Sequence, residues 1–174
     1  NAHWDKSQDL FAQMKKETDT EKIKKLSDQN IQELKAVLDE LPNNARVWIE
    51  LGNAYTWQSS LDVKTQADLC LAAFKKGEEL DPNNITYINN VGDQLIFMQR
   101  YDEAILQFQK TLRLTPNSGY ANLSLCKAYK GSKVYESARE SCQKAIDIFT
   151  SENKDGKYDS ELLEAKKVMA DIPK

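Results

Sequence analysis

The sequence is poor in the residue types that catalytic and metal sites use most often. Its 174 residues contain one histidine, His3, and three cysteines, none of them in a C-x-x-C pair. A Ser-His or Cys-His catalytic pair could therefore use only His3. Neither a zinc site nor a disulfide framework is indicated. The phosphate-binding pattern G-x-x-x-x-G-K-[ST] and the nucleophile pattern G-x-S-x-G are absent as well. We therefore expect no enzyme activity, no cofactor and no metal.

Long apolar runs and an excess of positive charge are also missing. No run approaches the roughly 20 apolar residues that span a bilayer, which predicts no direct membrane insertion. The formal net charge is -3, and because a nucleic-acid ligand needs a basic face, we expect no nucleic acid partner. The chain starts Asn1-Ala2-His3 without Met, and we interpret Asn1-Ala2 as the scar of a tag. A trimmed signal segment would make the protein periplasmic or a lipoprotein, so cytoplasmic and exported locations both stay open.

What the sequence does contain is an internal repeat. The string YDEAILQFQKTLRLTPN at 101–117 is followed by the similar string VYESARESCQKAIDIFT, which starts at Val134. A step of 34 residues aligns the two strings and recurs elsewhere: Tyr101 to Tyr135, Ala104 to Ala138, Phe74 to Phe108 to Cys142, Pro82 to Pro116, and Gly92 to Cys126. An earlier copy begins at Trp48, but Leu51 precedes Val91 by 40 residues, so that copy carries six extra residues. A spacing held at so many positions indicates repeated structural units.

Each repeated unit has the pattern of two antiparallel helices. In one unit, Ile88, Val91 and Leu95 recur at the spacing of one helix face. Pro82 and Pro116 follow the second helices, where a fixed φ and a missing N–H stop helical continuation. One such pair cannot bury its own apolar face, so neighbouring pairs are expected to stack into a solenoid.

The period and its marker residues resemble the tetratricopeptide repeat family over residues 45–150. The family pattern is W-x-x-L-G-x-x-Y followed by Ala, Phe and Pro. Three sets of residues carry it: Trp48, Leu51, Gly52, Tyr55, Phe74 and Pro82; Gly92, Tyr101, Ala104, Phe108 and Pro116; Leu125, Tyr129, Tyr135, Ala138 and Ala145. Ile88 and Asn122 replace the first-helix Trp, and Cys142 replaces the second-helix Phe. The resemblance implies an all-α fold, a right-handed α-α superhelix of about three repeats with a concave and a convex side.

The expected domain boundaries follow from the repeat. Residues 1–44 form the helices of a degenerate first repeat, and residues 45–84, 85–118 and 119–150 form three units. Residues 151–174 form a loop and a capping helix at 161–171, which covers the last apolar face. The six extra residues lie in the first of the three units. There Asp62 is expected to cap a long second helix, with Trp57 and Leu61 on a protruding hairpin.

The resemblance also implies where a ligand binds. Similar arrays hold extended peptides or helices in the concave groove, which is lined mainly by the first helix of each pair. Mapping that helix onto this sequence gives the expected groove residues: Arg46, Ile49, Glu50, Asn53, Trp57, Thr86, Asn89, Asn90, Asp93, Phe97, Tyr120, Leu123, Ser124, Lys127 and Lys130. Asn53 and Asn90 occupy positions where related arrays hold the ligand's backbone, because a side-chain amide offers both a donor and an acceptor.

The expected groove lacks the Lys and Arg cluster with which chaperone-binding members of the family clamp a C-terminal carboxylate. Ile49, Tyr120 and Ser124 stand where that pattern needs basic residues, and only Lys127 is retained. The mixture of acidic, basic and aromatic side chains suits a peptide with some basic and some apolar residues. We therefore expect a non-catalytic adaptor, co-chaperone or assembly factor, whose partner is a protein or peptide of unknown identity.

Two alternatives stay open at this point. The chain is alternatively a self-assembling scaffold that packs through its convex face or terminal helices, which would make it a homo-oligomer. Cys126 and Cys142 replace small or apolar core positions, so we interpret them as buried thiols. Because they are expected on facing helices of one unit, a disulfide is the alternative in an oxidising compartment.

Overall fold

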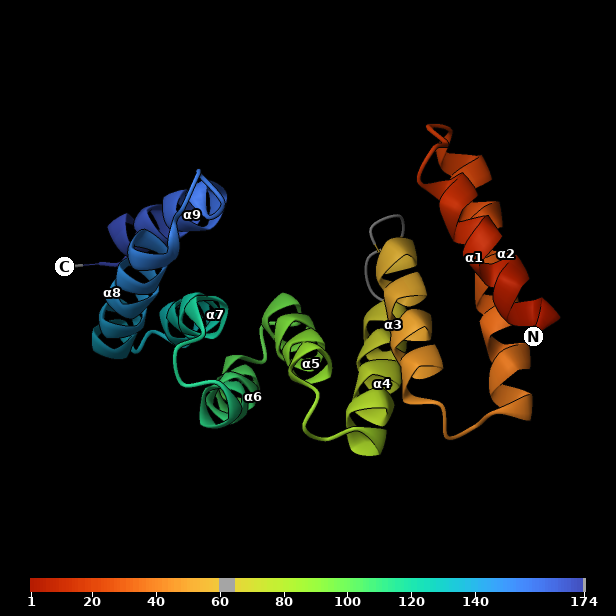
Figure 1. The fold of residues 1–174 in the computed structure, drawn as a ribbon, viewed down its shortest axis with the longest axis horizontal. Coiled ribbons are helices and arrows are strands. Elements are labelled where there is room, and N and C mark those ends of the chain that lie inside the picture. Colours follow the sequence, from red (N-terminus) through yellow and green to blue (C-terminus); the bar gives the residue numbers. More distant parts are fainter. Residues whose placement is uncertain (60–64, 174) are drawn as a thin grey trace. The chain divides into compact units, whose positions relative to one another are not determined.

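A computed structural model describes residues 1–59 and 65–173, and in this part of the chain all regular structure is helical (Figure 1). The helices are α1 (Ala2–Met14), α2 (Thr20–Glu40), α3 (Ala45–Ser59), α4 (Thr65–Leu80), α5 (Ile85–Phe97), α6 (Tyr101–Leu114), α7 (Gly119–Gly131), α8 (Tyr135–Glu152) and α9 (Asp159–Ala170). The all-α fold expected from the sequence is confirmed. The expected cap at Asp62 and hairpin at Leu61 lie outside the described residues.

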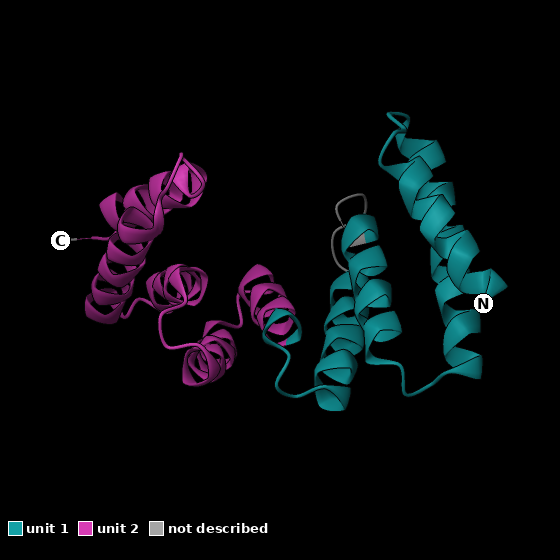
Figure 2. Cartoon of the chain, in the orientation of Figure 1, with its two compact units in different colours: residues 1–87 teal, residues 88–174 magenta. Residues whose placement is uncertain are grey.

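The chain forms two compact units, residues 1–87 and 88–174 (Figure 2). In unit 1, α1 packs on α2, α2 on α3, and α3 on α4. In unit 2, α6 packs on α7, α7 on α8, and α9 on both α8 and α7. Successive helices therefore pack on one another within each unit, as expected for stacked helix pairs.

The turn between the two helices of a pair is repeated in unit 2. Gln99 and Lys133, which are 34 residues apart, both have a left-handed backbone, with φ of 58° and 64°. The amide of the next residue reaches back to the carbonyl five residues earlier, from Arg100 to Leu95 and from Val134 to Tyr129. This hydrogen bond and the left-handed residue together form a helix-ending Schellman motif. The sequence period is thus matched by a period in the backbone.

In two helix pairs, α3–α4 and α5–α6, a glycine of the first helix lies under a phenylalanine of the second. A Cβ atom added at Gly52 would lie 2.4 Å from the Phe74 ring, and one at Gly92 would lie 2.6 Å from the Phe108 ring. Such distances leave no space for a side chain. Because Phe74 and Phe108 are buried, these glycines allow α3 and α4, and α5 and α6, to approach closely.

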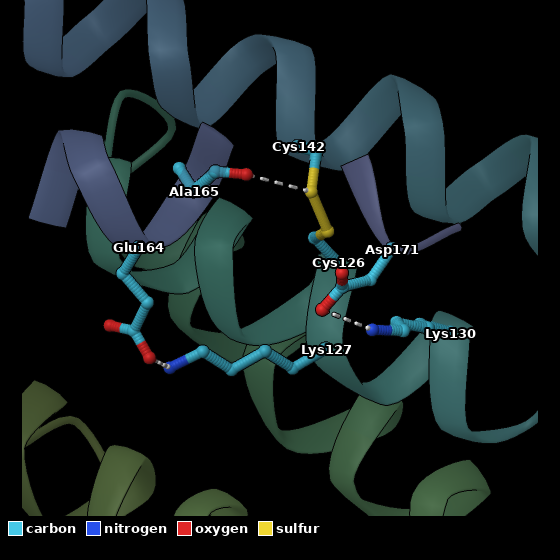
Figure 3. The surroundings of a disulfide bond; sticks show 7 residues. All are labelled: Cys126, Lys127, Lys130, Cys142, Glu164, Ala165 and Asp171. Atoms are coloured by element: carbon cyan, nitrogen blue, oxygen red, sulfur yellow. Dashed lines mark hydrogen bonds and ion pairs between the residues drawn. A yellow bond between two sulfur atoms is a disulfide. The ribbon is translucent and has the colours of Figure 1, made fainter. Parts of the chain in front are cut away.

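In α7–α8, two cysteines occupy the positions that Gly92 and Phe108 occupy in α5–α6. Cys126 and Cys142 form a disulfide, with Cα atoms 5.0 Å apart, and both are fully buried (Figure 3). The interpretation of these residues as thiols is therefore wrong, and the alternative pairing is the one in the structure. Facing positions on two close helices bring the Cβ atoms within the reach of a disulfide.

The C-terminal helix covers the disulfide end of unit 2. The helix expected at 161–171 is α9 (Asp159–Ala170), and the Ala165 carbonyl oxygen lies 3.7 Å from Cys142 Sγ. After α9, Ile172 is buried against the two cysteines and Ala138. Arg139 of α8 donates to the Pro173 carbonyl oxygen at 2.7 Å. The end of α7–α8 is thus capped by apolar and polar contacts together.

Candidate interaction surface

In unit 1, two of the expected groove residues on α3, Arg46 and Trp57, contact α1. The guanidinium of Arg46 is 5.1 Å from the centre of the Trp4 ring, a cation–π contact. At the other end of α3, the Trp57 ring meets Phe11 edge to face, with ring centres 6.0 Å apart. The first helices of two neighbouring pairs therefore lie side by side here, joined through aromatic contacts.

The amide of Asn53 has a partner on its own helix. Its Nδ2 lies 3.4 Å from Glu50 Oε2, one turn earlier on α3. Both residues are half-buried, whereas Thr86 at the start of α5 is exposed. A ligand backbone that paired with Asn53 would replace this long hydrogen bond, which costs little because its geometry is weak.

In unit 2, two expected groove residues pair with each other between α5 and α7. The Tyr120 hydroxyl donates to the Asp93 carboxylate. Burial of its hydroxyl raises the pKa of Tyr120 well above its usual range, and the negative charge of Asp93 raises that pKa further. Tyr120 therefore stays protonated and keeps donating to Asp93 at physiological pH. Phe97, also on α5, is 54% exposed and offers an apolar contact.

The two lysines expected in the groove form ion pairs with α9. Lys127 Nζ lies 2.6 Å from Glu164 Oε1, and Lys130 Nζ lies 3.4 Å from Asp171 Oδ2 (Figure 3). Both pairs are partly exposed, and such pairs contribute roughly 0–1 kcal/mol to stability. A ligand carboxylate could therefore replace either partner at low cost.

Three of the expected groove residues are buried and so do not line an open surface. Ile49 is 5% exposed and packs on Gly77 of α4. A Cβ atom added at Gly77 would lie 2.5 Å from Ile49 Cδ1. Leu123 packs on Ala145, Phe149 and Ala165, and Ser124 is 3% exposed. A first helix packs against its own second helix and against neighbouring pairs. The face that it leaves exposed is therefore narrower than the list of expected groove residues assumed.

Two asparagines of α5 differ in their bonding. Asn89 accepts a hydrogen bond of 2.7 Å from the Thr111 hydroxyl of α6, so its carbonyl oxygen serves the helix pair. Asn90 is half-buried at the next position of the helix. The role of Asn90 in holding a ligand backbone stays a prediction.

A second surface in unit 1 was missed by the sequence reasoning. We call it the α2–α4 groove; its apolar residues are Leu38, Trp48, Leu51, Tyr55, Leu69, Ala72 and Ala73, and its charged residues are Lys35, Asp39 and Lys76. The groove has a volume of about 700 Å³, within the usual range for ligand clefts. Leu69 on α4 is exposed beside the exposed Asp68 and Ala72. A leucine between such positions of a second helix is the signal that the sequence offered.

Two simple kinds of site do not occur in residues 1–59 and 65–173. None of the helices there is long and apolar enough to cross a membrane. No group of three histidine, cysteine or carboxylate side chains comes together there in a way that could hold a metal ion.

Known proteins resemble the chain in structure. No protein-family model matches the sequence, and no curated protein matches it. A structure of MamA from MSR-1 is 26% identical, with a TM-score of 0.62 over 72% of this chain and 68% of that one. A crystal structure of MamA is 23% identical, with a TM-score of 0.63 over 84% and 86%. MamA from residue 41 to its end, from Desulfovibrio magneticus RS-1, is 17% identical, with a TM-score of 0.65 over 97% and 93%.

These similarities show that the chain has the helical-repeat fold of the MamA structures. They confirm the fold class that the sequence predicted, and this fold fits the tetratricopeptide resemblance. A helical-repeat fold of this kind indicates a protein-interaction or scaffold module.

Proposed function

We propose that the chain is a non-catalytic protein-interaction module that holds a peptide or helix of a partner protein on its first helices. The observation that carries this proposal is the surface chemistry of α3, α5 and α7. Those helices present amides, aromatic rings and charges of both signs, which is the composition of peptide-binding surfaces. The helical-repeat fold shared with the MamA structures supports the same function.

The residues proposed to contact the partner are the expected groove residues that keep exposed surface. They are Arg46, Glu50, Asn53, Trp57, Thr86, Asn89, Asn90, Asp93, Phe97, Tyr120, Lys127 and Lys130. The exposed rings of Phe97 and Tyr120 would anchor apolar side chains of the partner. The Asn53 and Asn90 amides would hold its backbone, and Lys127 would exchange Glu164 for an acidic group of the partner.

An affinity pull-down from the source lysate tests this function, with the wild type beside Asn53→Ala/Asn90→Ala. A partner retained by the wild type and lost by the variant supports the proposal, provided that circular dichroism shows unchanged helicity. The matched control is Asn83→Ala/Asn117→Ala, which alters two exposed turn asparagines away from the first-helix surfaces. A partner that binds the Asn53→Ala/Asn90→Ala variant as well as the control would contradict the proposed surface.

Self-assembly is the second candidate function, and two exposed side chains favour it. Leu163 on α9 is 70% exposed and Leu106 on α6 is 65% exposed. Exposed apolar residues of this size are frequent in contacts between copies. Sedimentation velocity over a range of concentrations should then show oligomers that Leu163→Ser/Leu106→Ser removes. A monomer at all concentrations would contradict self-assembly and leave partner binding as the candidate function.

A further inference from the structure

The α2–α4 groove has an apolar floor and an exposed apolar wall. Both α2 and α4 pack on α3, whose Leu51 and Tyr55 are only 4% and 6% exposed and form the floor. On the α4 wall, Leu69 is 46% exposed and Ala72 beside it is exposed too. Apolar side chains in this arrangement fit a helix that lies along two helices at once.

The same three-helix arrangement recurs in unit 2 with different residues, which shows that the fold does not require the apolar lining. The repeat steps place α6, α7 and α8 where α2, α3 and α4 lie in unit 1. Trp48 corresponds to Asn122, Leu69 to Ser137, and Ala72 to Glu140. Asn122 Nδ2 donates a hydrogen bond of 2.9 Å to the Ser118 carbonyl oxygen of its own helix.

A second polar contact in unit 2 involves the position that corresponds to Lys35. This position is Gln109, whose Nε2 donates to the Tyr129 hydroxyl at 3.2 Å, so the second helix there bonds directly to the first. In unit 1 the corresponding pair is Lys35 over the Tyr55 ring, 5.9 Å from its centre. Exposed apolar side chains that the fold can replace by Ser and Glu are a reason to look for a partner.

The charges along the groove indicate the chemistry of that partner. Lys35 on α2 and Lys76 on α4 place a positive charge on each wall, and Asp39 is the single carboxylate among the groove residues. Within the part of the chain that the structure describes, Lys35 has no carboxylate partner, and Lys76 pairs only with the exposed Glu79 of its own helix, at 2.9 Å. Acidic groups of a partner would therefore complement both walls.

We propose that the α2–α4 groove of unit 1 binds an amphipathic helix of a partner protein, whose apolar side chains enter the groove between flanking Asp or Glu residues. This proposal rests on the protein-interaction function and adds a second surface to it. The apolar side chains meet Leu69, Ala72 and the half-buried Trp48, and the carboxylates of the helix meet Lys35 and Lys76. Helix-in-groove recognition of this kind reads apolar anchors at one helix face.

The test is a selection from a displayed library of helical peptides on the full chain, with Leu69→Ser/Ala72→Glu as the counter-selection. This variant introduces the residues that the chain itself has at the corresponding positions of α8, so the helix is expected to form. Peptides that are lost on the variant should carry apolar residues on one face and Asp or Glu beside them. Their Kd, measured by fluorescence anisotropy, should rise at least about tenfold on the variant.

A second variant tests the charges without touching the apolar lining. Lys35→Glu/Lys76→Glu should raise the Kd of the acidic peptides by about tenfold. A selection repeated on this variant should enrich basic peptides. Both lysines lie at the rim, so this variant keeps the core intact even if the first variant does not fold. Selected peptides without an acidic bias, or binding unchanged in both variants, would overturn the proposal.

Fluorine NMR locates the bound peptide directly. The chain has 3 tryptophans, and 5-fluorotryptophan labelling gives each a resonance that a Trp→Phe variant assigns. A selected peptide should shift the resonance of Trp48 and leave those of Trp4 and Trp57 in place. If the Trp48 resonance instead moves with protein concentration when no peptide is present, the groove binds a second copy of the chain. That result would overturn the proposal of a partner helix.

The outcomes separate this groove from the proposed function. Peptides that bind the wild type and Leu69→Ser/Ala72→Glu equally would overturn the groove, while an interaction surface elsewhere on the chain would remain. The pull-down with Asn53→Ala/Asn90→Ala alters no residue of the α2–α4 groove, so its failure would not affect the selection result. A selection that enriches no peptide on the wild type would overturn the groove proposal.

Discussion

Where Phe108 of α6 packs on Gly92 of α5, the next helix pair has a covalent bond between Cys126 and Cys142. The two pairs share the repeat period, the left-handed turn residue and the close approach of their helices. They differ in what holds the helices together at the centre. In α5–α6 a buried ring fills the space, and in α7–α8 two sulfur atoms bridge it. The period therefore specifies a close contact between two helices, and different chemistry satisfies it.

This difference gives the two pairs different sensitivities. The α5–α6 contact depends on packing volume, because Phe108 is fully buried and every atom lost leaves a cavity. The α7–α8 contact depends on redox conditions, because a reductant can open the bond. The four predictions below test this contrast, from the largest expected effect to the smallest.

Phe108→Ala should lower the free energy of unfolding by about 3–5 kcal/mol, since it removes a fully buried ring and leaves a cavity. Urea unfolding followed by circular dichroism measures the change. Leu106→Ala on the same helix is the control, because Leu106 is 65% exposed and its loss should cost less than about 0.5 kcal/mol. Equal losses in the two variants would contradict the packing of α5–α6 described above.

Reduction of Cys126–Cys142 should lower the free energy of unfolding by about 3 kcal/mol, the loop-closure contribution of a bond between residues 16 apart. Urea unfolding with and without a dithiol reductant measures it. The variant Cys126→Ala/Cys142→Ala is the control and should not respond to the reductant, although buried Cys70 remains. A wild type with the same midpoint in both conditions would show that the bond does not stabilise α7–α8.

Gly92→Ala should destabilise the protein by about 1–2 kcal/mol, because the overlap of the new Cβ with Phe108 exceeds the roughly 1 kcal/mol gained in helix propensity. In a Phe108→Leu background the smaller side chain leaves space, so the same substitution should cost less. A double-mutant cycle in urea measures this coupling. Additive effects would mean that the α5–α6 contact does not depend on Gly92.

Gln99→Gly and Lys133→Gly should each stabilise the protein slightly, by about 0.5 kcal/mol. Glycine relieves the cost of a left-handed backbone but loses more entropy on folding. The shift in thermal midpoint should be similar at the two positions, since the turn is the same in both pairs. A stabilisation at only one of them would show that the turns are not equivalent.

Much of the fold could be predicted from local pattern. The step from Gly92 to Cys126 identified helix pairs, and the helix expected at 161–171 is α9 (Asp159–Ala170). The assignment of residues 1–44 to a degenerate repeat stays a prediction. The state of Cys126 and Cys142 could not be decided from the sequence, because an odd number of cysteines fits both thiols and one bond.

The site was predicted less completely than the fold. The mapping placed Ile49 and Leu123 on the surface, but packing against other helices buries both. It also gave no sign that Lys127 would pair with Glu164, 37 residues later, because the position of α9 decides that contact. The α2–α4 groove was missed because Lys35, Trp48 and Leu69 lie on three helices that only the packing brings together.

The sequence by itself determined the helices and their pairing, because apolar period, proline and glycine positions act within one or two turns of the chain. The tertiary structure decided which side chains remain exposed and able to contact a partner. That depends on what each helix packs against, and such contacts join residues far apart in the sequence. The tertiary structure also decided that Cys126 and Cys142 are bonded, since a disulfide requires two specific Cβ positions in space.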